Sequence, residues 1–186
     1  LRALYATALY KQGNAGAAKE IADSILGSDK NNIDALLVRA RIEMQQRDLT
    51  AALNDAQIVV RDFPMSEQGR VLLADIYLAR NDPQRARQSY EDAIGDLPQS
   101  ILLARTYTQY LMKTGGAPRA VEVARTLTRK SPSSVQGWDL FANVCKQAGD
   151  SGCVAQAQAG RDKAASVYTV DDQPGSVRGR GLFGRL

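Results

Sequence analysis

Few side chains in this sequence are of the kinds that carry out catalysis or hold metals. The 186 residues include no histidine and only two cysteines. The absence of histidine excludes histidine-based triads, histidine metal sites and histidine acid–base chemistry. Two cysteines cannot form a four-cysteine zinc site, and neither a GxxxxGK(S/T) nor a GxGxxG phosphate loop is present. We therefore expect no metal and no organic cofactor.

The two cysteines are the most reactive groups that remain. Cys145 and Cys153 are separated by seven residues that include Gly149 and Gly152. If they lie on two helices joined by a tight turn, their Cα atoms come within disulfide range, about 4.4–6.8 Å. Such a bridge favours an oxidising compartment, such as a periplasm. The alternative is two reduced thiols in a cytosolic protein, whereas a redox-active pair is disfavoured because CxxC is absent.

Carboxylates do not assemble into an acid–base site in the sequence. Asp75 and Asp139 are far apart and have no base or metal-ligand cluster beside them, so catalysis is not expected. Arg39 and Glu43 are four residues apart and share a face if the segment is helical, and Asp55 is a further partner for Arg39. We interpret this charged group as a buried or semi-buried ion pair that fixes hairpin packing, with a ligand site as the alternative.

The elements that position these residues follow an internal repeat of 34 residues. Alanine recurs at this interval, at Ala18, Ala52, Ala86 and Ala120. Proline recurs at Pro64, Pro98 and Pro132. A small residue recurs at Ala6, Ala40, Ala74, Thr108 and Ala142. A fixed period of this length is typical of stacked supersecondary units, each of which buries its apolar face against its neighbours.

The period predicts helical hairpins in which two amphipathic helices approach closely at their small residues. Proline ends the second helix because the residue before it avoids helical dihedrals. The sequence thus predicts an all-α superhelix, an α-solenoid of about five hairpins. The expected helices cover residues 1–12 and 15–27, 33–46 and 49–62, 67–80 and 83–95, 99–113 and 117–130, and 134–147 and 152–168.

These residues resemble the tetratricopeptide repeat (TPR) family, whose pattern is W-x2-L-G-x2-Y, then A-x3-F-x2-A, then P. The third repeat matches at Leu73, Ala74, Tyr77, Ala86, Tyr90, Ala93 and Pro98. The fifth begins with Trp138, Phe141 and Ala142 at first-helix positions. We expect a TPR array over residues 1–169, with repeats near 1–32, 33–66, 67–100, 101–134 and 135–169.

The resemblance implies a concave groove lined by the first helix of each repeat. The positions that correspond to it here are Tyr10, Leu37, Arg41, Met44, Val71, Asp75, Leu78, Arg105, Gln109, Met112, Asp139 and Asn143. Its middle is apolar and suits the apolar face of a helix or an extended peptide. The Lys and Asn signature of a carboxylate clamp for chaperone tails is absent from the matching positions.

The second helix of the fifth repeat departs from the pattern. The family alanine falls at Val154, and Ala155 fits better if one residue is inserted. The segment from 155 to 165 is rich in alanine, and we interpret it as the last helix, which caps the array against solvent.

Residues 170–186 form a basic tail that contains Arg178, Arg180 and Arg185. We expect a flexible terminus, and the alternative is a short linear motif anchored by Leu182 and Phe183. The net charge is +4, but basic and acidic residues are interspersed, so nucleic acid is not an expected partner. No run of about 18 apolar residues predicts a membrane span.

The resemblance implies a non-catalytic scaffold that binds a protein or peptide. The alanine-rich repeats of this sequence are similar to TPR segments of bacterial envelope and exopolysaccharide-assembly proteins. The cysteine pair indicates the same compartment. The alternative is a non-catalytic TPR arm of a larger enzyme, because the chain begins at Leu1 and is expected to be a fragment. An exposed apolar first helix also makes a homodimer an open expectation.

Overall fold

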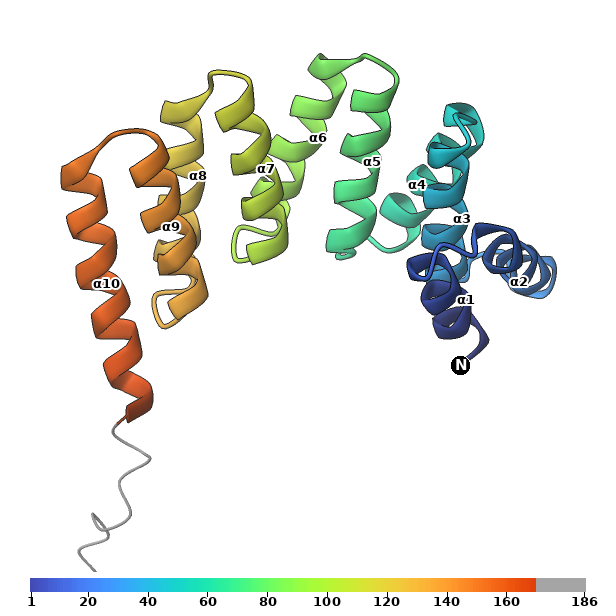
Figure 1. Ribbon diagram of the computed structural model, residues 1–186, viewed down its shortest axis with the longest axis horizontal. Helices are drawn as coiled ribbons and strands as arrows, with labels where there is room; N and C mark the ends of the chain where they lie inside the picture. The colour runs from blue at the N-terminus through green and yellow to red at the C-terminus, as the bar shows by residue number, and fades with distance from the viewer. Residues whose placement is uncertain (170–186) are drawn as a thin grey trace, which may run out of the picture.

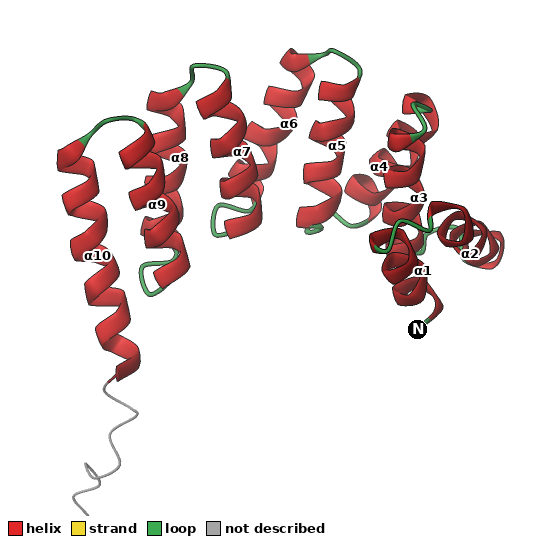
Figure 2. Ribbon diagram, in the orientation of Figure 1, coloured by secondary structure: helices red, strands yellow, loops and turns green. Residues whose placement is uncertain are grey.

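The computed structural model describes residues 1–169, and in this range the chain forms ten helices and no strand. Figure 2 shows helices joined by short loops, and Figure 1 shows them as hairpins standing side by side in a curved row. The helices are α1 (Arg2–Lys11), α2 (Ala15–Ser28), α3 (Ile33–Gln45), α4 (Leu49–Asp62), α5 (Glu67–Ala79), α6 (Pro83–Asp96), α7 (Ile101–Lys113), α8 (Ala117–Lys130), α9 (Val135–Gln147) and α10 (Ser151–Thr169). The all-α solenoid is confirmed, and every expected helix is present with its ends within two residues of the prediction.

Helix starts are set by capping side chains that repeat with the 34-residue period. A capping oxygen accepts a hydrogen bond from the backbone N–H three residues later, as in a standard N-cap. The first helices α3, α5, α7 and α9 use Asn32, Ser66, Ser100 and Ser134. The second helices α2, α4, α6 and α10 use Asn14, Asp48, Asp82 and Asp150. Gly116 precedes α8, which therefore has no side-chain cap.

The turn inside each hairpin contains one residue in the left-handed region, again every 34 residues. These residues are Gly13, Arg47, Asn81, Gly115 and Gly149, with φ between 59° and 83°. Glycine and asparagine adopt this conformation readily, whereas arginine does so at a steric cost. The shared backbone conformation lets each second helix return along its first helix at the same angle.

The hydrophobic interior is divided into two clusters that meet at α5. The N-terminal core contains buried residues from α1 to α5, including Leu72 and Ile76. The C-terminal core contains buried residues from α5 to α10, beginning with Ala74. The repeated alanines at positions 18, 52, 86 and 120 are fully buried, as close helix approach requires.

The predicted ion pair lies inside the second hairpin. Arg39 on α3 donates two hydrogen bonds to Asp55 on α4, from Nε at 2.7 Å and from Nη2 at 2.9 Å. Its Nε also lies 3.7 Å from Glu43 Oε1. A third acidic partner, Asp23 on α2, accepts a bond from Nη1 at 3.2 Å. The structural interpretation of this group is confirmed, and Arg39 links three successive helices.

The expected insertion in the last hairpin is wrong. Helix α10 begins at Ser151, 34 residues after α8 begins at Ala117, so the register continues without an extra residue. Ala155 is exposed, and the buried positions on α10 include Cys153, Ala157 and Ala164. The buried face is therefore turned by about one residue toward Cys153, which is bonded to α9.

Candidate binding groove

The odd-numbered helices form one continuous face of the array. Helices α1, α3, α5, α7 and α9 each pack against the next odd-numbered helix, whereas the even-numbered helices pack mainly on the odd-numbered helices before and after them. Because only the odd-numbered helices pack directly on one another along the row, we take their shared face as its inner, concave side. Three of the hollows in the structure lie along this inner face, which we call the groove.

The N-terminal cavity of the groove has a volume of about 460 Å³ and lies between α1, α3, α5 and the start of α7. Its lining residues are Thr7, Tyr10, Lys11, Arg41, Met44, Gln68, Val71, Leu72, Asp75 and Leu102. Met44, Val71 and Leu102 give it an apolar floor, while Lys11 and Arg41 bring positive charge to its sides. Apolar walls with a few polar groups are typical of sites that orient a ligand.

Arg41 is a half-buried guanidinium that has no acidic partner within 4.0 Å among residues 1–169. Its Nη2 donates a hydrogen bond to Gln68 Oε1 at 3.2 Å. Burial lowers the pKa of Arg41, and the nearby Tyr10 and Asp75 oppose this only in part. An arginine in such surroundings remains charged, so it attracts an anion.

Asp75 also lines this cavity, but its carboxylate is hydrogen-bonded to a residue of α6, outside the cavity. The Tyr90 hydroxyl donates to Asp75 Oδ1 at 3.1 Å. Burial raises the pKa of Asp75, although this hydrogen bond and Arg41 act in the opposite direction. Tyr90 in turn stacks on Tyr107, with 5.0 Å between ring centroids, so the groove carboxyl is anchored to the C-terminal core.

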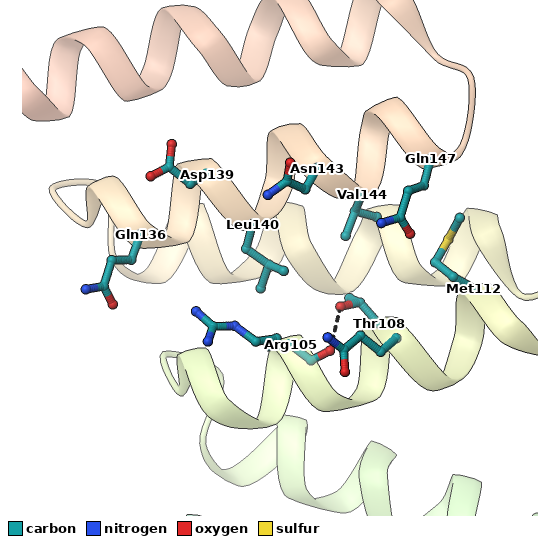
Figure 3. Close-up of a pocket in the computed structure, with 10 residues that line it drawn as sticks. Arg105, Thr108, Met112, Gln136, Asp139, Leu140, Asn143, Val144 and Gln147 are labelled. Atoms are coloured by element: carbon teal, nitrogen blue, oxygen red, sulfur yellow. Dashed lines mark hydrogen bonds between the residues drawn. The ribbon is translucent and has the colours of Figure 1, made fainter.

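The C-terminal cavity of the groove has a volume of about 330 Å³ and lies between α7 and α9. Figure 3 shows the side chains of both helices around it, with Gln136 and Gln147 at opposite ends. Its lining residues are Arg105, Thr108, Gln109, Met112, Gln136, Asp139, Leu140, Asn143, Val144 and Gln147. Four of them carry a carboxamide, which offers both a donor and an acceptor.

A third hollow of about 440 Å³ lies at the turn end of α3 and α5. Met44 and Asp75 line both this hollow and the N-terminal cavity, and Leu78 lines this one alone. The apolar surface of the groove therefore extends past the N-terminal cavity toward the turns.

Eleven of the twelve predicted groove residues line one of these three cavities. The exception is Leu37, which is 4% exposed and packs in the N-terminal core, so its placement in the groove is corrected. Sequence reasoning missed Gln136 and Gln147. Their spacing could have identified them, because positions 136, 140, 143 and 147 fall on one face of the helix α9.

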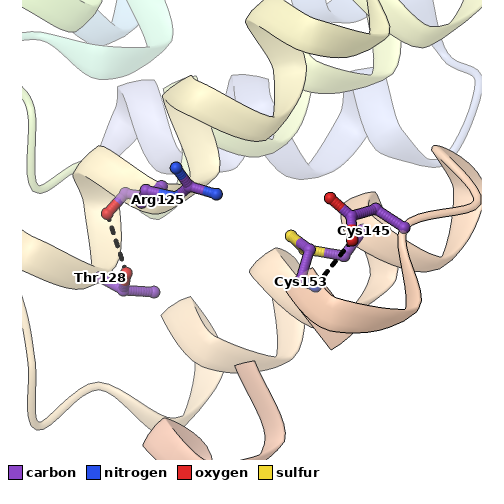
Figure 4. The surroundings of a disulfide bond; sticks show 5 residues. Arg125, Thr128, Cys145 and Cys153 are labelled. Atoms are coloured by element: carbon purple, nitrogen blue, oxygen red, sulfur yellow. Dashed lines mark hydrogen bonds between the residues drawn. A yellow bond between two sulfur atoms is a disulfide. The ribbon is translucent and has the colours of Figure 1, made fainter. Parts of the chain in front are cut away.

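The last hairpin is joined by a disulfide between Cys145 and Cys153, with 5.5 Å between the Cα atoms. Figure 4 shows it at the end of α9 and the start of α10, opposite Arg125 of α8. Both cysteines are buried. The guanidinium of Arg125 lies 5.7 Å from the ring centre of Phe141, a cation–π distance. The expected flexible basic tail, residues 170–186, lies outside the described residues, as does the alternative of a linear motif there.

No group of three histidine, cysteine, aspartate or glutamate side chains in residues 1–169 converges as metal ligands would. None of the helices in that range combines the length and hydrophobicity that crossing a bilayer requires.

Comparison with known families decides the classification. The sequence model described as "Tetratricopeptide repeat" matches residues 5–57 and 37–101, which together cover more than half of the chain. The chain belongs to the tetratricopeptide repeat family. TPR proteins are in general non-catalytic modules for protein–protein interaction. No curated protein sequence matches the chain.

Solved structures agree with this TPR assignment. TTC0263, a thermophilic TPR protein of Thermus thermophilus, has a TM-score of 0.60 at 17% identity, covering 89% of this chain and 90% of its own. PilW, a widely conserved type IV pilus biogenesis factor, has a TM-score of 0.59 at 18% identity, and the match covers 92% of this chain and 79% of PilW. YrrB, a TPR protein with an unusual peptide-binding site, has a TM-score of 0.52 at 11% identity, and the match covers 91% of this chain and 87% of YrrB. At these identities the likeness concerns the fold alone.

Proposed function

We propose that this TPR array is a non-catalytic scaffold that binds a protein or peptide segment in the groove of its odd-numbered helices. The observation that carries the proposal is the row of cavities along one face, with an apolar floor and unpaired basic and amide groups at its sides. The peptide-binding site of YrrB, a protein of the same fold, supports a peptide as the ligand.

We further propose a role in assembly at a bacterial cell envelope. The disulfide between Cys145 and Cys153 supports an oxidising compartment, because such bonds persist outside the reducing cytosol. The likeness to PilW, a pilus biogenesis factor, supports the same location. Counting free thiols in denaturant, on protein taken from its native compartment without reductant, tests this. Two free thiols per chain contradict the proposed location.

The location of binding is tested with a matched pair of double variants. Arg41→Glu with Met44→Ala alters the groove, whereas Arg61→Glu with Met65→Ala makes the same changes at exposed positions outside the three groove cavities. The wild-type protein is used to capture partners from its native extract at high salt, with mass spectrometry as the readout. We expect the control variant to keep the captured protein and the groove variant to lose it.

Circular dichroism establishes that both variants keep their helical content. If a folded groove variant captures the same partner as the control does, binding does not occur in the groove. If only salt-sensitive nucleic acid or lipid is captured, the scaffold proposal itself is refuted.

Self-association through α1 is a further part of this proposal. Leu4 and Tyr5 on this helix are 63% and 59% exposed, and Leu1 just before it is exposed as well, so several large apolar side chains gather at this end of the array. Sedimentation velocity over a concentration series, on wild type and on Leu4→Lys, distinguishes a homodimer from a monomer. A monomer at all concentrations contradicts it.

A further inference from the structure

The charged groups that line the two main cavities are unevenly partnered. Lys11, Arg41 and Arg105 form no ion pair with any residue of the range 1–169. Of the two carboxylates, Asp139 is paired with Arg161 at 2.6 Å, whereas Asp75 accepts the Tyr90 hydroxyl and keeps its charge. Three cations without an ion-pair partner therefore accompany one such carboxylate in the groove, and charge complementarity favours an anionic ligand.

Arg41 is the best placed of these cations. Its guanidinium is half-buried beside the apolar floor formed by Met44, Val71 and Leu102, and only one of its side-chain hydrogen bonds is made, to Gln68. A planar guanidinium binds a carboxylate through two parallel hydrogen bonds. Because folding has already removed part of the water around Arg41, a carboxylate that enters this cavity meets a partly desolvated partner.

The apolar floor next to Arg41 adds a second requirement on the ligand. Met44, Val71 and Leu102 line the same cavity as the guanidinium, and Leu102 is 39% exposed. In an extended peptide, residues two apart point to the same side and are separated by about 6.5–7 Å. A carboxylate and an apolar side chain at such positions enter one cavity together.

The C-terminal cavity has a different character. Gln109 on α7 and Gln136, Asn143 and Gln147 on α9 all line the cavity. Their carboxamides are solvent-exposed and take part in none of the side-chain hydrogen bonds found within residues 1–169. A carboxamide bonds both the N–H and the C=O of a peptide main chain, whatever side chain the peptide carries. From residue 136 to residue 147 the helix rises about 16 Å, the length of about five extended residues.

We propose that the groove binds an extended peptide segment in two parts. In the N-terminal cavity, Arg41 binds an aspartate or glutamate carboxylate while Met44, Val71 and Leu102 take an apolar side chain two residues away. In the C-terminal cavity, the four amides hold the peptide main chain with little dependence on sequence. This inference rests on the proposed function and specifies its ligand.

The test starts from a phage-displayed library of random dodecapeptides selected on the wild-type protein and on Arg41→Gln. We expect wild-type selections to be enriched in an acidic residue two positions from Leu, Ile, Met or Phe, and Arg41→Gln selections to lose the acidic residue. Fluorescein-labelled copies of the selected peptides are then titrated by anisotropy. Arg41→Gln should weaken binding at least about tenfold, as expected for loss of one partner of a half-buried charge pair.

Three further variants separate the two halves of the groove. Arg41→Lys keeps the charge but not the paired geometry and should give an intermediate affinity. Gln147→Ala should weaken peptides of different sequence by similar factors, because the amide contacts the main chain. Arg61→Gln, an exposed arginine on α4, is the control and should leave affinity unchanged.

The outcomes distinguish this inference from the proposed function. Peptides selected without acidic enrichment, with affinities unaffected by Arg41→Gln but lost in Arg41→Glu with Met44→Ala, overturn the inference and leave the groove proposal standing. If no peptide is selected, or if selected peptides bind that double variant equally well, both fail. Displacement of the peptide by single-stranded oligothymidylate at the same affinity shows general anion binding and also overturns the inference.

Discussion

Replacing Glu43 with leucine should stabilise the second hairpin at neutral and alkaline pH. Glu43 on α3 is 8% exposed, and its Oε2 has no hydrogen-bond partner. Arg39 directs its short hydrogen bonds to Asp55 and leaves Glu43 at 3.7 Å. Burial, followed by the charge of Asp55, raises the pKa of Glu43 to about 7, while Arg39 and Lys19 oppose the increase.

The sign and size of the effect follow from this pKa. A free glutamate has a pKa of 4.5, so the folded protein binds the Glu43 proton more tightly than the unfolded chain does. Its contribution to stability is complete below pH 4.5 and is lost as pH rises through about 7. Each pKa unit corresponds to about 1.4 kcal/mol, so the free energy of unfolding should fall by about 3 kcal/mol across this range.

Glu43→Leu removes the ionisable group from a position that leucine occupies in other repeats, as Leu9 and Leu111. At pH 8 the free energy of unfolding of the variant should be about 3 kcal/mol higher than that of wild type, and at pH 5 the difference should be smaller. Urea unfolding followed by circular dichroism between pH 5 and pH 8 measures both. Glu20→Leu, at an exposed position on α2, should keep the wild-type pH profile.

Two results would refute this reasoning about Glu43. One is a wild-type free energy of unfolding that does not fall between pH 5 and pH 8. The other is a Glu43→Leu variant that is less stable than wild type at pH 8, which would mean that the carboxylate contributes more through Arg39 than its burial costs.

Three further predictions concern turns, packing and the disulfide. Arg47→Gly should raise the free energy of unfolding by about 0.5–1 kcal/mol, because Arg47 has φ of 66°. Gly160→Ala should lower it by about 1–3 kcal/mol, because the new methyl group overlaps the Trp138 indole. As Trp138 is the only tryptophan, its fluorescence should also change. Reducing Cys145–Cys153 should lower the free energy of unfolding by about 2–3 kcal/mol, measured in urea with and without dithiothreitol.

Matched controls accompany these three changes. Gly27→Ala, at a helical glycine whose Cβ would meet nothing within 4 Å, should be neutral or stabilising. Arg61→Gly, the control for Arg47→Gly, places a glycine inside the helix α4 and should lower the free energy of unfolding by about 1 kcal/mol. The double variant Cys145→Ser with Cys153→Ser should be unaffected by dithiothreitol. Equal effects of Gly160→Ala and Gly27→Ala would contradict the packing argument.

The repeat register was readable from the sequence because several local signals share it. The alanine at Ala86 recurs every 34 residues, as does the left-handed backbone at Asn81, and the cap at Asp82 has counterparts before every second helix except α8. Close packing, helix starts and turns are all decided within a few residues of the chain, so periodicity alone predicts them. The contact between Arg39 and Asp55 was predictable for the same reason, since it lies within one hairpin.

The finer placement of side chains was less predictable. Leu37 and Arg41 are four residues apart on α3, so their directions differ by only about 40°, yet Leu37 is buried while Arg41 lines the groove. The buried face of α10 was misassigned, since Cys153 and Ala157 are buried whereas Ala155 is exposed. Asp23 joins Arg39 from the preceding hairpin, and contacts between hairpins depend on superhelical geometry that a single repeat does not encode.

The division of the interior at α5 has a mechanical consequence. Within residues 1–169 the buried side chains form two clusters that share helix α5, with Leu72 and Ile76 in one cluster and Ala74 in the other. Packing among buried side chains therefore couples the two ends of the array only through α5. The N-terminal cavity is lined by α1, α3, α5 and the start of α7, whereas the C-terminal cavity lies between α7 and α9. A ligand long enough to occupy both cavities contacts both clusters directly, so we expect it to stiffen the array.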